Sequence, residues 1–319
     1  MRRPLLWGLM VAVLAAVTTG AGPRSTIEHR RVVESPGEAV GMVALVVVAD
    51  LTWSNAPLAL DGYAKANLSM RSAPRQSGTG DTYLSLGKGG RSAAPAGAGP
   101  FDWTALRGHD AGLRQGGTLG TLGQALQDGR RRWALVTDDW QAVPLAATAT
   151  GTVPATYPGT ADGVRRALQA QPHAVFVAVP HWRLPATIEL LSGACTLVVS
   201  GSTPAANRSL GVLAASNRCG LGTAGLASPS THRAHLATLP DVSATFLHLL
   251  GRTVPASVTG GPVTPAGAAD RRDLVERGQR SWTADRARMV FVPLFVVLHG
   301  IGATVAVRRR RAQIGRAHV

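Results

Sequence analysis

The run MVALVVVA, residues 42–49, is the feature that most constrains what this chain can fold into. It is an unbroken series of apolar residues, half of them β-branched valines, which is typical of a central strand covered on both faces. The run stops at an acid, Asp50, and a carboxylate at the end of a buried strand can hold a metal ion or take part in catalysis. Asp50 is therefore the first candidate site residue.

Further apolar runs predict parallel strands, and capped helical patterns lie between them. The expected strands cover residues 132–138, 173–179 and 194–200. The expected helices cover residues 118–129, 160–170 and 184–193, the first of them ending at Gly129 as a C-cap. This alternation predicts an α/β fold with a doubly wound, mostly parallel sheet. The Gly- and Ala-rich residues 87–100 are expected to form a surface loop.

The N-terminal residues 1–22 have the pattern of a secretory signal. Arg2 and Arg3 precede an apolar segment, Leu5–Val17, and small residues follow it. Thirteen helical residues span only about 20 Å, whereas a bilayer core is about 30 Å thick. A signal peptide is therefore favoured over a signal anchor, which remains the alternative.

The other end of the chain predicts one transmembrane helix, residues 289–307, about 28 Å long. Arg308–Arg311 follow it directly, which places the tail, residues 308–319, in the cytoplasm. Residues 263–288 are expected to be a linker. The α/β domain, residues 23–262, is then held at the cell membrane on its extracytoplasmic side, with the lipid bilayer as one partner.

The net charge of +15 does not indicate nucleic-acid binding. Lys65 and Lys88 are the only lysines, and the arginines are scattered through the middle of the chain. Abundant Arg, Ala, Gly and Pro together suggest GC-rich coding and an actinobacterial source, which explains a basic composition without a nucleic-acid partner. Cell-envelope components or other membrane proteins are the expected partners instead.

The last residues, IGRAHV (Ile314–Val319), match one reading frame of a common sequencing adapter. We expect them to be an assembly scar and exclude them from the fold prediction. The natural protein is then expected to continue past Gln313, and the chain is expected to be a fragment.

Cys195 and Cys219 are the only cysteines, and both fall in the region predicted to be exported. An even pair in an oxidising compartment can form a disulfide, and two buried free thiols are the alternative. No zinc site is expected, because the two cysteines lack a matching histidine pair at the H-x3-5-H spacing of structural zinc sites.

The order of these segments resembles the alkaline phosphatase superfamily, and in particular actinobacterial membrane proteins whose exported domain has that fold. VVVADLTWSN is similar to their first strand and the turn after it, and TLGTLGQAL to a helix that opens the next unit. The remaining similarity lies in LSMRSAPRQSGTGDTYLSLGKGGRSA and in the late helix LPDVSATFLHLLGRTVP. Together these stretches cover most of residues 43–255.

The resemblance implies two divalent metals, held by Asp and His around a Ser, Thr or Cys nucleophile. This chain departs from that pattern at several ligand positions. The register of the first turn puts Ala49 at the ligand position and Asp50 at a glycine, and Pro180 follows the strand 173–179 where an acid is expected. The late Asp-His pair would fall near Gly201 and Ser202, and no Asp-His dipeptide occurs in the sequence. Asp50 is therefore expected to form a turn, and no cofactor is predicted.

Other residues are candidates for a relocated site. Thr79 and Ser85 lie near the region that the resemblance assigns to the nucleophile. Asp81 is a candidate residue of a relocated site, and His232 and His235 have a three-residue spacing that can ligate a metal. Solvated loop histidines are the alternative for the second pair. The Asp138-Asp139 pair could act as acid and base, although a turn or helix-capping role is the more common use of such a pair.

Three functions remain open from the sequence. The leading hypothesis is a membrane-anchored pseudoenzyme that binds components of the cell envelope. The second is an active metal-dependent phosphatase, phosphodiesterase or phosphotransferase that uses Asp50, Asp81 and one of the two histidines. The third is the outer domain of a multi-span transporter or envelope-assembly protein. Fold alone does not choose between them.

Overall fold

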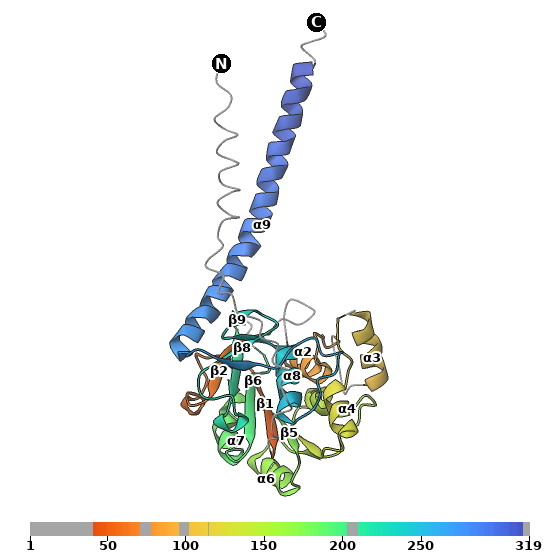
Figure 1. The fold of residues 1–319 in the computed structure, drawn as a ribbon. Helices are drawn as coiled ribbons and strands as arrows, with labels where there is room; N and C mark the ends of the chain where they lie inside the picture. Colours follow the sequence, from red (N-terminus) through yellow and green to blue (C-terminus); the bar gives the residue numbers. More distant parts are fainter. Residues whose placement is uncertain (1–40, 71–77, 96–101, 114, 203–209, 315–319) are drawn as a thin grey trace. The chain divides into compact units, whose positions relative to one another are not determined.

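A computed structural model describes residues 41–70, 78–95, 102–113, 115–202 and 210–314 (Figure 1). The described strands form one mixed sheet in the order β11-β8-β2-β7-β6-β1-β5-β3-β4, with β10 beside β2 and β9 beside β8. The strands of its parallel half are β1 (Val43–Val48), β3 (Trp133–Thr137), β4 (Thr156–Tyr157), β5 (Ala174–Val179) and β6 (Cys195–Ser200). The remaining strands are β2 (Ala64–Ser69), β7 (Gly211–Ala215), β8 (Gly225–Ser228), β9 (Arg233–Ala234), β10 (Leu236–Thr238) and β11 (Thr264–Ala266).

The strand β1 lies at the centre of the parallel half, between β5 and β6, and all six of its residues are buried. Its alternate side chains point to opposite faces of the sheet. Val43, Leu45 and Val47 belong to one apolar cluster, and the intervening residues of the strand belong to another. Burial on both faces explains why this strand is an unbroken apolar run.

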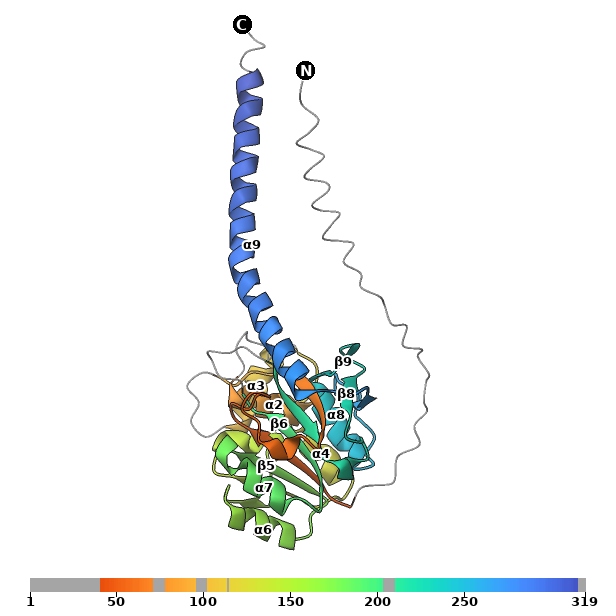
Figure 2. The same ribbon diagram turned by 90° about the vertical axis from the view of Figure 1, so that its left-hand side faces the viewer.

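Helices cover both faces of the sheet (Figures 1 and 2). One face packs against α2 (Thr79–Lys88), α4 (Thr121–Asp128), α5 (Val143–Ala146) and α8 (Leu239–Leu249). The other packs against α6 (Ala161–Gln169), α7 (Leu184–Leu190) and the start of α9 (Arg271–Ile314). The helix α3 (Trp103–Gly112) packs through Leu106 in a smaller cluster. Short 3-10 turns occur at η1 (Leu58–Leu60), η2 (Trp140–Ala142), η3 (His181–Arg183) and η4 (Asn217–Cys219). The predicted α/β fold with a mostly parallel sheet and helices on both faces is confirmed.

Two predicted segments differ in the structure. Residues 87–100 were expected to be a surface loop, but α2 continues to Lys88 and residues 87–90 are buried. The expected linker, residues 263–288, contains β11, which pairs with β8, and the first turns of α9, where Leu274 is buried. Both segments are rich in residues that often form turns, but residues 87–90, β11 and the start of α9 pack against other elements.

The termini carry the remaining expectations. The predicted signal, residues 1–22, and residues 315–319 of the tail lie outside the described residues. No helix built from the described residues combines the length and apolar character that a membrane crossing requires.

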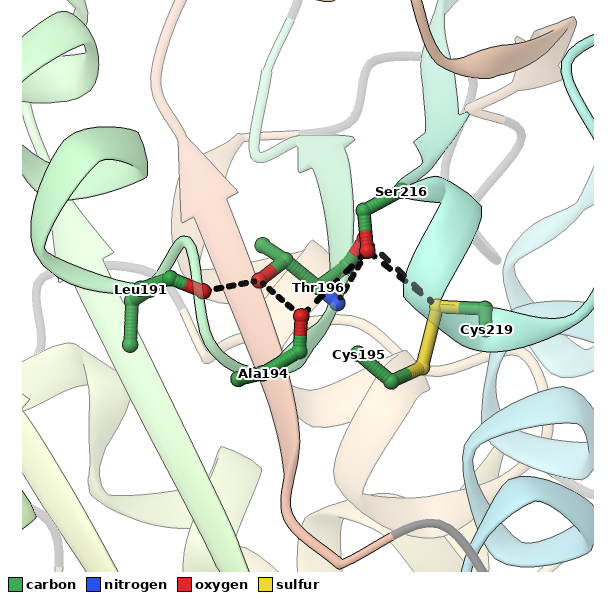
Figure 3. The surroundings of a disulfide bond; sticks show 6 residues. All are labelled: Leu191, Ala194, Cys195, Thr196, Ser216 and Cys219. Atoms are coloured by element: carbon green, nitrogen blue, oxygen red, sulfur yellow. Dashed lines mark hydrogen bonds between the residues drawn. A yellow bond between two sulfur atoms is a disulfide. The ribbon is translucent and has the colours of Figure 1, made fainter.

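The two cysteines form a disulfide, Cys195–Cys219, which joins the start of β6 to η4 (Figure 3). The Oγ of Ser216 accepts a hydrogen bond from the backbone N of Thr196 at 2.9 Å, beside the bridge. The disulfide closes the β6–β7 hairpin at the end where β6 begins. The described residues contain no free cysteine.

Candidate functional site

The edge of the sheet where the parallel strands end is the candidate site. The strand β7 is antiparallel to both β6 and β2, so β1, β2 and β6 all run in the same direction. Asp50 follows β1 and Ser202 follows β6 at this edge. Side chains that follow neighbouring parallel strands meet at one edge, which is where open α/β sheets bind their ligands.

Asp50 closes the turn after β1. Its backbone has a φ of 53°, the left-handed conformation that Gly, Asn and Asp tolerate best. Ser202 Oγ donates to Asp50 Oδ1 at 2.8 Å and accepts from the backbone N of Asp50 at 2.9 Å. Asn55 Nδ2 donates to the carbonyl of Asp50 at 2.8 Å. The structure therefore places Asp50 in a hydrogen-bonded turn.

Thr79 is the first residue of α2 and lies against the same edge. A Cβ added at Gly201 would lie 3.2 Å from Thr79 Cγ2 and 3.1 Å from Val47 Cγ1. A larger residue at position 201 would therefore crowd both. The structure thus brings Thr79 close to the turn after β6 and to the end of β1.

Asp81 serves as the cap of α2. Its Oδ2 accepts from the backbone N of Gly78 at 2.9 Å, and its Oδ1 accepts from the backbone N of Ala94. Asp81 is buried. Both carboxylate oxygens therefore satisfy backbone donors, which is the ordinary role of an acid in the first turn of a helix.

His232 and His235 lie on either side of β9. Both have left-handed backbones, with φ of 51° and 61°. The ring of His235 donates from Nε2 to the carbonyl of Gly267 at 3.0 Å. The described His, Cys, Asp and Glu side chains include no group of three or more that could hold a metal ion.

The two acids after β3 differ in role. Asp138 accepts from the backbone N of Gly159 and forms an ion pair with Arg183 NH1 at 2.8 Å. The hydrogen bond from the Arg183 guanidinium is the main reason that the pKa of Asp138 is lowered. Asp139 caps η2 by accepting from the backbone N of Gln141 at 2.9 Å. Asp139 also adds to the raised pKa of Tyr83, which is due chiefly to burial.

A buried ion pair that the sequence did not predict joins the end of α2 to α3. Lys88 is only 1% exposed, and its Nζ donates to Asp110 Oδ1 at 2.7 Å and Oδ2 at 2.8 Å. Ser92 Oγ donates to the same carboxylate at 2.6 Å. The sequence gives one indication of this pair, because lysine is rare in this arginine-rich chain. A lysine that occurs where arginine is the usual basic residue can have a specific partner.

Asp241 is another buried carboxylate, and it caps the helix α8. Its Oδ2 accepts from the N and Oγ1 of Thr238, both at 2.7 Å, and from Ser230 Oγ at 2.8 Å. Its Oδ1 accepts from the backbone N of Gly261 at 3.1 Å. Asp241 thus caps α8 and holds two neighbouring loops, which is a structural role.

Comparisons with protein-family models and with curated proteins give no match to this chain.

Proposed function

We propose that this chain is a membrane-tethered, extracytoplasmic α/β domain that acts by binding in the cell envelope and not by metal-dependent catalysis. In this proposal it is a degenerate relative of the alkaline phosphatase superfamily. The observation that carries the proposal is the use of Asp50 and Asp81 to close a turn and cap a helix. A two-metal site needs such carboxylates as ligands.

The sequence of the segments that follow the strands supports the absence of a metal site. Residues 71–77 follow β2 in the chain and residues 203–209 follow β6, and neither segment contains Asp, Glu or His in its sequence. The residue after β5 is Pro180. A pair of divalent ions needs about six oxygen or imidazole ligands, and the acids at this edge fall well short of that number.

The composition and exposure of α9 support the tether. The helix has 44 residues and is about 66 Å long. Between Phe291 and Val305 its large apolar side chains are 44% to 66% exposed. The described part of α9 does not as a whole reach the length and apolar character of a membrane span, but its stretch from Phe291 to Val305 is apolar all round. Such a surface is usually covered by a large core or by a membrane. The proposed span, residues 289–307, rests on sequence, and the structure describes the side chains of residues 291–306 within it.

The disulfide supports an extracytoplasmic domain. Disulfides persist in oxidising compartments and are uncommon in the cytosol. Cys195 and Cys219 are both buried and bonded to each other. Arg308–Arg311 after the apolar stretch favour a cytoplasmic tail, which puts the domain on the opposite side.

Cell fractionation tests the tether. We expect the full chain to stay with membranes after an alkaline carbonate wash, and its domain to be digested by protease added to intact spheroplasts. A variant ending at Arg280 should become soluble in the periplasmic or secreted fraction. A full chain found in the carbonate supernatant, or protected from protease, would reject the proposal.

A second function, metal-dependent hydrolysis of phosphate or sulfate esters, is favoured by the position of Thr79 alone. This residue starts α2 beside the ends of β1 and β6. The hydrolase alternative predicts that Asp50→Asn abolishes turnover of a phosphodiester without lowering the melting temperature. The binding proposal predicts no metal-dependent turnover in the parent chain or in the Asp50→Asn variant.

A further inference from the structure

The first turns of α9 are bound to the domain, and Arg271 makes most of the polar contacts. Its Nε donates to the carbonyl of Trp53 at 2.9 Å, and its NH2 group donates to the carbonyl of Ala56. Its NH1 group pairs with Asp61 Oδ1 at 3.2 Å. A single guanidinium therefore joins the start of α9 to the whole segment that follows β1. The planar fork of arginine suits such multiple contacts better than lysine does.

Two further contacts hold α9 in place. Leu274 is buried among the apolar residues of one face of the sheet, and its carbonyl accepts from Asn67 Nδ2 at 3.1 Å. Arg277 NH1 donates to the carbonyl of Ala234 at 3.2 Å. The helix is therefore attached to β2 and β9 as well as to the segment after β1. A helix held at several points in its first turns cannot shift there without breaking these bonds.

A chain of hydrogen bonds leads from the candidate site to this attachment. Ser202 Oγ donates to Asp50 Oδ1, and the carbonyl of Asp50 accepts from Asn55 Nδ2. Asn55 Oδ1 in turn accepts from the backbone N of Thr52 at 2.7 Å. The carbonyl of the next residue in the chain is the one that Arg271 Nε contacts. The turn at the sheet edge and the start of α9 thus belong to one continuous network.

We propose that Arg271 couples the turn of residues 50–56 to α9, so that a change at the edge of the sheet is transmitted to the helix. The physical reason is that the turn and the helix share hydrogen-bonded partners, and neither can open alone without losing them. The coupling concerns the domain and its helix, and it does not depend on catalysis or on where the protein resides.

Hydrogen exchange of the full chain in detergent tests the coupling. Ser202→Ala removes the side chain that holds Asp50. We expect amides of residues 50–56 and of residues 271–280 to exchange about fivefold faster in this variant. Arg271→Gln should accelerate the same two segments. In the double variant, residues 271–280 should exchange no faster than in Arg271→Gln alone, because that substitution already removes the contacts that join the turn to α9.

Two matched controls accompany these variants. Ser230→Ala removes another serine that donates to a carboxylate, and Arg272→Gln removes a neighbouring arginine whose side chain is 85% exposed. Neither should change exchange in residues 50–56. Unchanged exchange of residues 271–280 in Ser202→Ala, or additive effects in the double variant, would overturn the proposal.

Discussion

At the scale of single residues, Asp50 shows how a carboxylate at a strand end can be committed to the backbone. Its left-handed φ and its two hydrogen bonds to Ser202 both belong to the turn. The register of the sequence placed Asp50 where the resembling proteins have glycine, and a positive φ is the conformation that glycine adopts most easily. The turn role of Asp50 could therefore be predicted from the sequence, but its partner Ser202 could not.

Substitutions at Asp50 separate backbone strain from side-chain contacts. We expect Asp50→Ala to lower the free energy of unfolding by about 2 kcal/mol, because it adds strain at positive φ and removes a hydrogen bond. Asp50→Gly should cost less, about 1 kcal/mol or below, because it relieves the strain. Urea denaturation measures both. Equal losses in the two variants would show that the left-handed backbone is not what the turn requires.

The Asp138–Arg183 pair gives a prediction about pH. The folded-state pKa of Asp138 is lowered, so the pair stabilises the fold above the ordinary carboxyl pKa, and this contribution is lost as the pH falls through the lowered value. The carboxylate is 56% exposed, so solvent screens the pair and its contribution is about 0.5 kcal/mol or less. We expect Arg183→Gln to be slightly less stable than the parent at pH 7 and equally stable near pH 2, as measured by thermal melting. A stability difference that grows on acidification would have the wrong sign.

At the scale of elements, the parallel strands were predictable because burial on both faces leaves continuous apolar runs in the sequence. The strand β2, AKANLS, was not, because three polar side chains, those of Lys65, Asn67 and Ser69, interrupt the apolar run. Two of these side chains donate hydrogen bonds to the backbone: Lys65 Nζ donates to the carbonyl of Asp61 at 2.7 Å, and Asn67 Nδ2 donates to the carbonyl of Leu274. These partners come from distant or irregular segments, which no local pattern reveals.

The misread loop after α2 has a similar cause. Glycine-rich sequence predicts a surface turn, but a Cβ at Gly87 would lie 2.0 Å from the carbonyl oxygen of Pro144. At Gly90 the added Cβ would lie 1.9 Å from the carbonyl oxygen of Gly116. These glycines are needed because other backbone segments pack against them. Sequence composition does not distinguish that requirement from a turn.

The buried Lys88–Asp110 pair beside this segment gives a stability prediction. Removing one partner leaves a buried charge unpaired, so we expect Asp110→Ala to cost about 3 to 5 kcal/mol. Replacing both residues by apolar ones, Lys88→Met with Asp110→Leu, should cost much less, because neither charge is then buried. Guanidinium unfolding of the two variants measures the difference. A double variant as unstable as the single one would indicate that packing, and not the unpaired charge, dominates.

At the scale of the whole molecule, the fold class followed from the sequence, whereas the function did not. An α/β sheet with helices on both faces presents its strand ends at one edge, and many chemistries use that edge. In this chain the edge holds a turn acid, a helix-capping acid and a threonine at the start of α2. The function that we propose, binding in the cell envelope, requires no pair of catalytic metals at this edge.

Metal content measured together with hydrolysis is the most direct test of that claim. The full chain, purified in detergent without chelators and then equilibrated with zinc, manganese and magnesium, would be desalted and analysed by mass spectrometry and with a phosphodiester substrate. We predict substoichiometric metal and no turnover above the Asp50→Asn variant. Two tightly bound ions per chain, with hydrolysis that Asp50→Asn abolishes, would contradict the account.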